Sequence, residues 1–198
     1  MIYIFGDSHG SFNFSNLDLP NRNLSIPSIT IFRVGRDNEI LNFEPSFNTE
    51  HSTFIFTYGE VDCRCHVKRQ ENLGREWKEV CKDLIEAYFN TIKNNVKIYS
   101  KIIICSITPT VIQSLYEQYN APIGHEFPFV GTDQERLNYT LYMNNLIKTK
   151  CEENERFYYL DSYDYYSENG FLKYELSDKI CHIKENGEII KRLKTILV

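Results

Sequence analysis

The chain has 198 residues, a formal net charge of -5 and a hydrophobic content of 42%. This length is enough for one sizeable hydrophobic core, so we expect a single domain over residues 1–198. The acidic balance and the lack of a Lys/Arg cluster argue against nucleic acid or an anionic membrane as a partner.

Localisation and redox state can also be inferred from the sequence. The apolar runs, such as KIIICSI at 101–107, are too short to cross a bilayer, and the N-terminus lacks the pattern of a signal peptide. The six cysteines fall mostly within apolar segments, where a small hydrophobic side chain would fit. We therefore expect a cytoplasmic protein with reduced thiols and no disulfide framework.

Five apolar runs predict the strands of a sheet. The runs at 1–5, 28–35 and 52–59 each end at or just before a glycine, which is typical of a buried strand followed by a turn. Two further runs, at 97–108 and 156–163, predict the fourth and fifth strands. The runs are apolar throughout and do not alternate with polar residues, which is typical of strands that are buried on both faces.

Three segments have helical periodicity. Residues 74–96 place apolar side chains on one face and charged side chains on the other. A second helix begins with a T-x-x-E capping box and runs from 132 to about 151, and a closing helix is predicted at 187–197. The stretch 109–131, which holds three of the six prolines, is predicted to be a loop. Helices that alternate with buried strands predict an α/β fold with a parallel sheet.

Polar motifs follow several of the predicted strands. GDSHG follows the first strand, GEVDCRCH begins at the end of the third, and DSYDYY ends the fifth. Because ligands of such folds bind at the carboxyl ends of the strands, we expect the functional site there. The first motif allows two interpretations: Ser8 can be a nucleophile, or Asp7 and His9 can be metal ligands.

The metal interpretation rests on a resemblance to a known family. An Asp-x-His pair after a strand resembles the first motif of the calcineurin-like metallophosphoesterases, in which Asp7 and His9 would hold one ion of a two-metal site. That family also requires a later Gly-Asp pair and an Asn-His pair. Here Arg36 separates Gly35 from Asp37, and no Asn-His pair follows the third strand. The metallophosphoesterase therefore remains an alternative.

The order of the motifs along the chain favours the nucleophile. With Gly6, Asp7 and Ser8 as a first block, the sequence resembles the SGNH (GDSL-type) hydrolases, which are serine esterases and acyltransferases. The resemblance implies a three-layer flavodoxin-like α/β sandwich with a central, mostly parallel five-stranded sheet. It also implies that Ser8 is the nucleophile and an oxyanion donor, that Gly35 supplies the second block, and that His9 lines the pocket.

The third block departs from the family pattern. Gly-x-Asn-Asp aligns with the four residues from Gly59 to Asp62, so either Val61 or Asp62 stands where the resemblance requires an amide donor. Arg64 and His66 lie just beyond and can donate in its place. The whole run GEVDCRCH, preceded by GDSH, resembles one SGNH-like branch.

The last family block, Asp-x-x-His, is matched by Asp178 and His182, which are four positions apart instead of three. In this resemblance His182 accepts the proton of Ser8 while Asp178 orients the imidazole, and no metal or organic cofactor is required. The C-x-C-H run at 63–66 could suggest zinc, but ligands this close together have poor geometry and no fourth ligand is apparent. We therefore expect no metal.

The expected function is an SGNH-like esterase or acyltransferase that acts on a small acyl group, most plausibly acetyl on a carbohydrate hydroxyl. The carbohydrate is suggested by the family and by the tyrosines of DSYDYY. The partner would be a small-molecule or glycan ester. Because the third block is altered and the Asp/His pair is stretched, a catalytically degenerate glycan-binding module is a further alternative.

Overall fold

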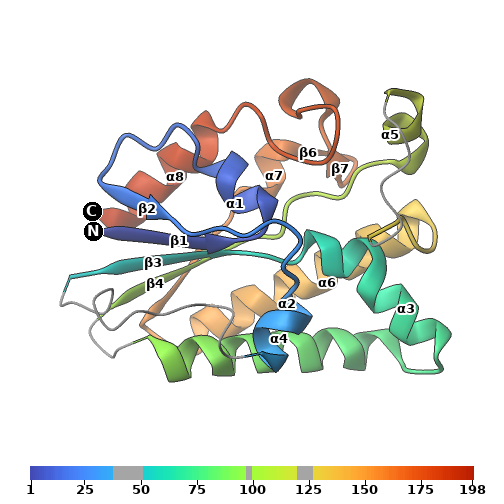
Figure 1. Cartoon of the computed structure of the whole chain (residues 1–198), viewed down its shortest axis with the longest axis horizontal. Helices are drawn as coiled ribbons and strands as arrows, with labels where there is room; N and C mark the ends of the chain where they lie inside the picture. The colour runs from blue at the N-terminus through green and yellow to red at the C-terminus, as the bar shows by residue number, and fades with distance from the viewer. Residues whose placement is uncertain (38–50, 97–99, 120–126) are drawn as a thin grey trace.

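The structure, a computed structural model, describes residues 1–37, 51–96, 100–119 and 127–198. Its main sheet has five parallel strands in the order β2-β1-β3-β4-β5 (Figure 1). The strand bounds are Ile2–Gly6 (β1), Asn21–Asn23 (β2), Thr53–Thr57 (β3), Lys101–Cys105 (β4) and Phe157–Leu160 (β5). The predicted fold class, a flavodoxin-like α/β sandwich around a five-stranded parallel sheet, is confirmed.

Helices cover both faces of the sheet. Figure 1 shows α1 and α8 on one face and α2, α4 and α6 on the other. The α-helices are Ser8–Asn13 (α1), Ile31–Arg36 (α2), Val67–Asn72 (α3), Trp77–Asn95 (α4), Gln113–Tyr119 (α5), Asp133–Glu152 (α6), Tyr163–Tyr166 (α7) and Gly187–Leu197 (α8). The smaller elements are a π-helix at Asp62–His66 (η3), a 3-10 turn at Tyr174–Leu176 (η4) and the antiparallel pair Ser167–Glu168 (β6) and Phe171–Leu172 (β7).

Alternate residues of each strand enter two separate hydrophobic cores. In β1, Tyr3 and Phe5 belong to the core under α4 and α6, where they stack on Phe54 and Phe56 of β3 with ring centroids 5.4 and 5.5 Å apart. Ile4 points to the opposite core, which α1 and α8 cover. Because both faces are buried, the strands lack polar alternation, as the sequence predicted.

The predicted second strand is wrong. The strand is Asn21–Asn23, three exposed polar residues that pair with β1 at the edge of the sheet. The run at 28–35 instead contains α2. Ile31 and Val34, three positions apart, are both fully buried against the core, which is a helical spacing. A short polar edge strand carries no apolar signal, so the sequence pattern could not identify it.

The start of α2 is fixed by a distant carboxylate. Locally, Thr30 Oγ1 accepts a hydrogen bond from the N–H of Arg33 at 3.1 Å. In addition, the fully buried Asp62 accepts from the first two helical N–H groups, of Ile31 at 2.7 Å and of Phe32 at 3.2 Å. These bonds satisfy donors that have no partner within the helix, so Asp62 stabilises a helix thirty positions away.

The other predicted helices and strands agree with the structure, whereas the predicted loop at 109–131 is wrong in part because it contains a helix. The three predicted helices correspond to α4, α6 and α8, and both hydrogen bonds of the predicted capping box are present at the start of α6. The remaining predicted strands correspond to β1, β3, β4 and β5, with residues 97–99 outside the described part. The predicted loop 109–131 contains α5, and its residues 120–126 also lie outside the described part.

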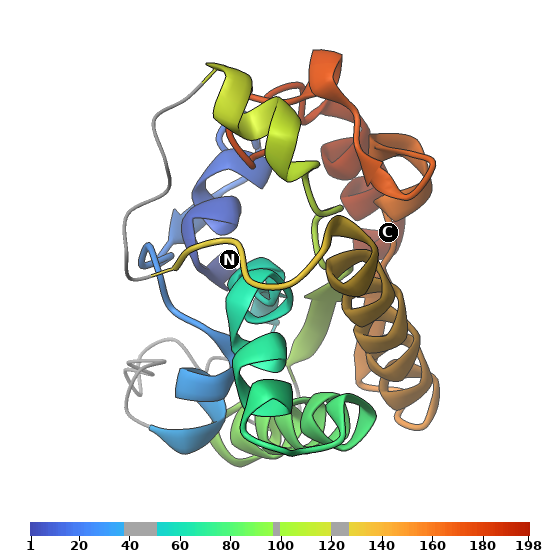
Figure 2. The same ribbon diagram turned by 90° about the vertical axis from the view of Figure 1, so that its right-hand side faces the viewer.

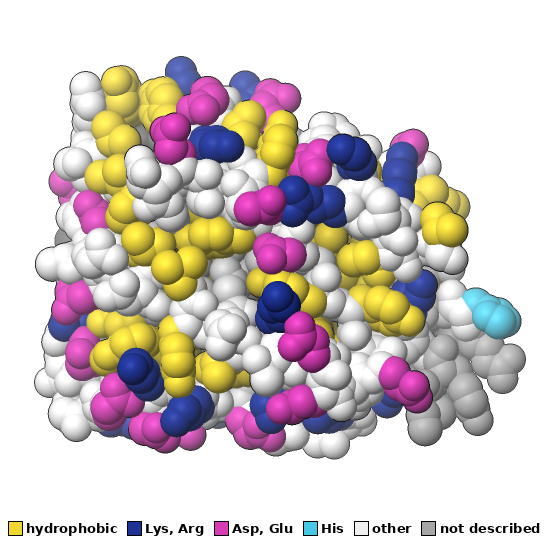
Figure 3. All heavy atoms as spheres, turned by 180° about the vertical axis from the view of Figure 1, so that it is seen from behind, with side chains coloured by type: hydrophobic (Ala, Val, Ile, Leu, Met, Phe, Trp, Pro, Cys, Tyr) yellow, Lys and Arg dark blue, Asp and Glu magenta, His cyan; other side chains and the backbone are white. Residues whose placement is uncertain are grey.

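The surface is mixed in character. Figure 3, seen from behind the view of Figure 1, shows acidic and basic side chains interspersed with hydrophobic ones over this face. Neither sign of charge dominates there, in keeping with the small net charge of the chain. Within the described ranges, no helix has the length and apolar character that crossing a membrane would need.

The role of Asp62 in holding α2 predicts a large loss of stability in Asp62→Ala. This change leaves two helix N–H groups without their acceptor, and we expect the free energy of unfolding to fall by about 2 kcal/mol or more. Thr30→Ala, which removes only the local cap, should cost about 1 kcal/mol. Urea denaturation measures both. An Asp62→Ala variant as stable as Thr30→Ala would contradict the assignment.

Candidate active site

The carboxyl ends of the strands gather the polar motifs at one edge of the sheet. Figure 2 looks onto this edge, where α1, η3 with α3, α5 and the segment after β5 surround the strand ends. Gly6 at the end of β1 pairs with Thr57 at the end of β3. The motifs GDSHG and GEVDCRCH therefore begin side by side, as parallel pairing requires.

Ser8 is the first residue of α1, directly after β1. Asp7 caps this helix, because its Oδ1 accepts from the N–H of His9 at 2.8 Å while its own N–H donates to the carbonyl of Thr57 at 3.3 Å. The tight turn needs Gly6, since a Cβ there would lie 2.8 Å from the Thr57 carbonyl oxygen. Ser8 is held with its side chain partly exposed and its N–H at a helix start, where no helical carbonyl can accept it.

The structure brings Ser8, His182 and Asp178 together. His182 Nε2 lies 2.9 Å from Ser8 Oγ, and His182 Nδ1 lies 2.6 Å from Asp178 Oδ2. The side chains of His182 and Asp178 are each 13% exposed, so the cluster can be reached from solvent. A hydroxyl, a base and an orienting carboxylate in this order form the geometry of an activated serine.

The four-residue spacing of Asp178 and His182 is accommodated by a turn. The N–H of Asp178 donates to the carbonyl of His182 at 2.9 Å, and Asp178 Oδ1 accepts from the N–H of His182 at 3.0 Å. Ser177 and Ile183 flank this turn as an antiparallel bridge. The backbone of Lys179, within this turn, adopts the left-handed region at φ 66°, and this conformation accommodates the additional residue. The stretched motif therefore still places both side chains in contact.

The surroundings of His182 raise its pKa. Burial by itself would lower the pKa, but the hydrogen bonds to Asp178 and to Cys181 outweigh it and raise the pKa to about 9. For Asp178, burial acts to raise the pKa, and the hydrogen bonds from the His182 ring and backbone lower it overall. The pair is thus stabilised as carboxylate and imidazolium.

Two neighbours of His182 were not identified from the sequence. The ring of Phe12, one turn after Ser8 on α1, stacks on the imidazole with centroids 4.1 Å apart and planes 6° apart. Cys181 Sγ lies 3.7 Å from His182 Nε2. The helical spacing of Phe12 from Ser8 is the only sequence signal for the first contact. Both contacts restrict the orientations open to the imidazole.

A buried charge network lies beside these residues. The His9 ring is tilted against that of His182, with centroids 4.8 Å apart. His9 Nε2 lies 3.5 Å from Glu60 Oε2, which in turn lies 3.4 Å from the Arg64 guanidinium. All three side chains are at least nine-tenths buried. Glu60 belongs to the quoted GEVDCRCH run, yet its burial between two cationic groups could not be read from that run.

The ionisation of this network follows from mutual neutralisation. Burial acts to raise the pKa of Glu60, but the charge of Arg64 and the contact with His9 lower it to about 2. Burial acts to lower the pKa of His9, but Asp7, Cys181 and Glu60 raise it well above its ordinary value. Glu60 is therefore a carboxylate held between two positive groups.

The glycines of the predicted second and third blocks, Gly35 and Gly59, have packing and turn roles in the structure. Gly35 does not end a strand; it lies within α2, where a Cβ would meet the Ala87 side chain at 2.7 Å, so it permits close packing of α2 on α4. Gly59, at φ +120°, makes the turn after β3, and a Cβ would lie 2.7 Å from the Ile107 side chain. The assignment of Gly35 failed because it depended on the wrong second strand.

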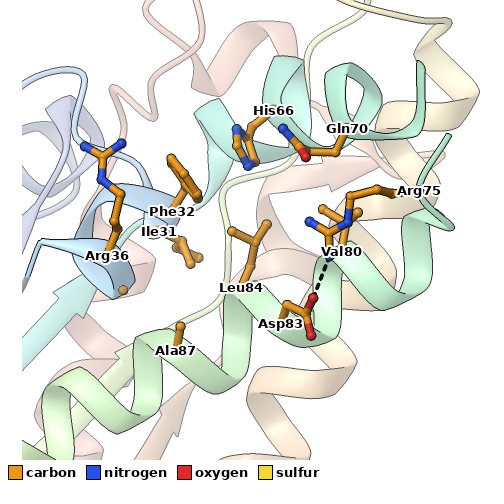
Figure 4. A pocket seen from close by; sticks show the side chains of 11 residues that line it. Ile31, Phe32, Arg36, His66, Gln70, Arg75, Val80, Asp83, Leu84 and Ala87 are labelled. Carbon is orange, nitrogen blue, oxygen red and sulfur yellow. Dashed lines mark hydrogen bonds and ion pairs between the residues drawn. The ribbon is translucent and has the colours of Figure 1, made fainter. Parts of the chain in front are cut away.

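Asp62 and His66, which the sequence placed at the substrate site, make other contacts in the structure. Both oxygens of Asp62 are engaged by the start of α2, so this carboxylate is not a substrate contact, and burial raises its pKa to about 7. His66 stacks on Phe32 with ring centroids 4.5 Å apart. It lines a pocket of about 230 Å³ between α2, α3 and α4, together with Phe32 and Leu84 (Figure 4). Gly35 lines the same pocket.

The thiols of the C-x-C-H run point to different partners. Cys63 Sγ contacts Met143 Sδ at 3.6 Å in the core, whereas Cys65 Sγ donates to the carbonyl of Val61 at 3.2 Å. In the described part of the chain, the group of side chains spaced to share a metal ion is a different one, His9, Cys181 and His182. Asp7, the other ligand of the metallophosphoesterase alternative, is not part of that group.

Comparison with known proteins supports the fold. No protein-family model and no curated protein matches the sequence. Among solved structures, a protein from Streptococcus pneumonia described as a platelet activating factor matches with a TM-score of 0.67 at 16% identity, over 100% of this chain and 83% of that chain. A protein from Bacteroides fragilis described as an acylhydrolase matches with a TM-score of 0.59 at 14% identity, over 99% of this chain and 85% of that chain. The structure of the acetyl xylan esterase AlAXEase matches with a TM-score of 0.56 at 13% identity, over 100% of both chains. The fold of this chain is thus similar to that of structures described as an acylhydrolase and an acetyl xylan esterase.

The raised pKa of His182 can be measured directly. NMR titration of its imidazole should give a midpoint of about 9 in the wild type. In Asp178→Asn the midpoint should fall by about one pH unit or more, because the carboxylate that stabilises the imidazolium is gone. Asp18→Asn, which removes a surface carboxylate paired with Lys194, is the control and should leave the midpoint unchanged. A wild-type midpoint near 6.5 would contradict the proposed electrostatics.

Proposed function

We propose that this protein is an SGNH-like serine esterase or acyltransferase with Ser8 as nucleophile, His182 as general base and Asp178 as the orienting carboxylate. The observation that carries the proposal is the pair of contacts at His182, 2.9 Å to Ser8 Oγ and 2.6 Å to Asp178 Oδ2. The likeness of the fold to esterase and acylhydrolase structures supports it.

The proposed reaction begins with attack of Ser8 Oγ on an ester carbonyl carbon. The hydroxyl proton passes to His182 Nε2, and Asp178 stabilises the imidazolium that forms. When the tetrahedral intermediate collapses, the leaving alcohol takes that proton and the acyl group stays on Ser8. His182 then deprotonates water, in a hydrolase, or an acceptor hydroxyl, in a transferase, which attacks the acyl carbon and frees Ser8.

The oxyanion of this intermediate needs donors that the altered third block does not supply. The first donor would be the backbone N–H of Ser8 at the start of α1. Arg64 remains the candidate for a second, because it is permanently charged and its Nε has no hydrogen-bond partner among the described residues. Glu60 would hold its guanidinium in place.

For the substrate, we propose a small acyl ester, namely an acetyl group on a carbohydrate hydroxyl. The support is the match to a structure described as an acetyl xylan esterase. Two of the three tyrosines of DSYDYY do not add to it, because the Tyr163 hydroxyl donates to the carbonyl of Gly170, and Tyr166 is buried with its hydroxyl donating to the carbonyl of Glu185. The third, Tyr165, is exposed beside Lys173. Acetate release from acetylated xylan, compared with longer acyl esters of the same sugar, tests this choice.

Ser8→Ala should lower the rate of nitrophenyl acetate hydrolysis by about 10³-fold or more, because the nucleophile is lost. Ser11→Ala, an exposed serine on the same helix, is the matched control and should retain the wild-type rate. A fluorophosphonate should label the wild type once, at Ser8. An unlabelled wild type that still binds glycans would instead favour the degenerate binding module.

The pH dependence of the reaction follows from the ionisation of His182. Only the neutral imidazole can accept the Ser8 proton, and the pKa of His182 is raised to about 9. We therefore expect kcat/KM for nitrophenyl acetate to rise from pH 6 and to level off only above about pH 9. In Asp178→Asn the profile should shift to lower pH with a much lower plateau. A wild-type profile that is flat above pH 7 would argue against His182 as the base.

A further inference from the structure

Three potential metal ligands form a cluster, and one of them, His182, lies 2.9 Å from the Ser8 hydroxyl. The ligand atoms of His9, Cys181 and His182 are all within 4.8 Å of one another. Cys181 Sγ is 3.7 Å from His182 Nε2. Zinc bonds of about 2.0 Å to nitrogen and 2.3 Å to sulfur give a nitrogen–sulfur separation of roughly 3.6 Å in a tetrahedral site. The distance between Cys181 Sγ and His182 Nε2 therefore already matches the separation of two ligand atoms in a zinc site.

Both histidines are oriented by carboxylates, as metal-bound histidines commonly are. His182 Nδ1 lies 2.6 Å from Asp178 Oδ2, which leaves Nε2 as the ligand atom. His9 Nε2 lies 3.5 Å from Glu60 Oε2, which leaves Nδ1. That Nδ1 is buried and has no hydrogen-bond partner among the described residues. An orphaned nitrogen of this kind is the second, independent sign of a ligand.

The charges around the cluster favour a dication. Three carboxylates, Asp7, Glu60 and Asp178, act on the two histidines, and Arg64 is the cation paired with Glu60. His182 is partly exposed, so an ion can approach from solvent.

We propose that His9, Cys181 and His182 bind one Zn²⁺ and that the bound ion inhibits the proposed esterase. On binding, the Cys181 thiol releases its proton to solvent as the sulfur–zinc bond forms. Each imidazolium likewise releases the proton of its ligand nitrogen to solvent, and the freed lone pair forms the nitrogen–zinc bond. The lone pair of His182 Nε2 is then no longer available to Ser8. Inhibition rests on the proposed function, whereas metal binding does not.

Cobalt is the probe for binding, because tetrahedral Co²⁺ with a thiolate ligand absorbs visible light and adds a thiolate-to-metal charge-transfer band. Chelator-treated wild-type protein should bind one Co²⁺ per chain with both signals, and Zn²⁺ should displace it. Ser8→Ala should behave in the same way, so the site can be verified even if the protein is no esterase. Absence of the charge-transfer band in the wild type would overturn the proposal.

Ligand identity is tested by a pair of cysteine variants. Cys181→Ala should lose the charge-transfer band and weaken Zn²⁺ binding by about 100-fold or more. Cys65→Ala is the matched control, since it is another buried cysteine next to a histidine, and it should bind like the wild type. Glu60→Gln should keep the band but weaken binding by about 10-fold, as expected of a positioning residue. Loss of the band in Cys65→Ala but not in Cys181→Ala would overturn the assignment.

Inhibition is measured as the ratio of nitrophenyl acetate hydrolysis without and with saturating Zn²⁺, within each variant. This ratio should exceed about 10 in the wild type and in Cys65→Ala, and should be close to 1 in Cys181→Ala at the same concentration. Excess chelator should restore the wild-type rate. Equal inhibition of Cys181→Ala and the wild type would show that zinc acts elsewhere. A wild type that binds Zn²⁺ without loss of rate would overturn the inhibitory role.

Discussion

The close approach of β1 and β3 at their carboxyl ends is the constraint on which the site depends. Gly6 and Thr57 pair there, and any side chain at Gly6 would collide with the Thr57 backbone and with Gly10. Asp7 is tied to the Thr57 carbonyl, and the side chain of Asn13 lies 3.5 Å from the Thr57 hydroxyl. Both ends of α1 are thus anchored to the end of β3. These contacts fix the orientation of α1, and therefore the position of Ser8, relative to the sheet.

Buried charges are the second organising feature of the site. Burying Glu60 alone would be costly, and the neighbouring Arg64 and His9 offset that cost. Asp62, two positions further on, is stabilised differently, by the N–H groups that begin α2. The run after β3 therefore has two carboxylates that face different parts of the protein, one towards the proposed catalytic residues and one towards a helix.

The sequence was most informative where the structure is governed by local pattern. Continuous apolar runs predicted β1, β3, β4 and β5, and helical periodicity predicted α4, α6 and α8, because burial on a given face requires those patterns. The order of the motifs also predicted one site made of Ser8, His182 and Asp178, and in the structure His182 lies 2.9 Å from Ser8 Oγ and 2.6 Å from Asp178 Oδ2. Their catalytic roles remain proposals.

Prediction failed where distant residues decide the structure. The apolar run at 28–35 suits a strand, but it contains α2, whose first two N–H groups donate hydrogen bonds to the distant Asp62. The placement of Gly35 failed with it. Glu60 was overlooked because its significance comes from burial between His9 and Arg64, which lie on different elements, α1 and η3.

The separation of Ser8 and His182 by 174 positions has a consequence for how the site can be lost. His182 reaches Ser8 from a short turn that is held by the bridge between Ser177 and Ile183, by the hydrogen bonds between Asp178 and His182, and by the stacking of Phe12. Local opening of this turn would separate base from nucleophile while the five-stranded sheet stays folded. Partial proteolysis or mild denaturant could then abolish the chemistry well before the main unfolding transition.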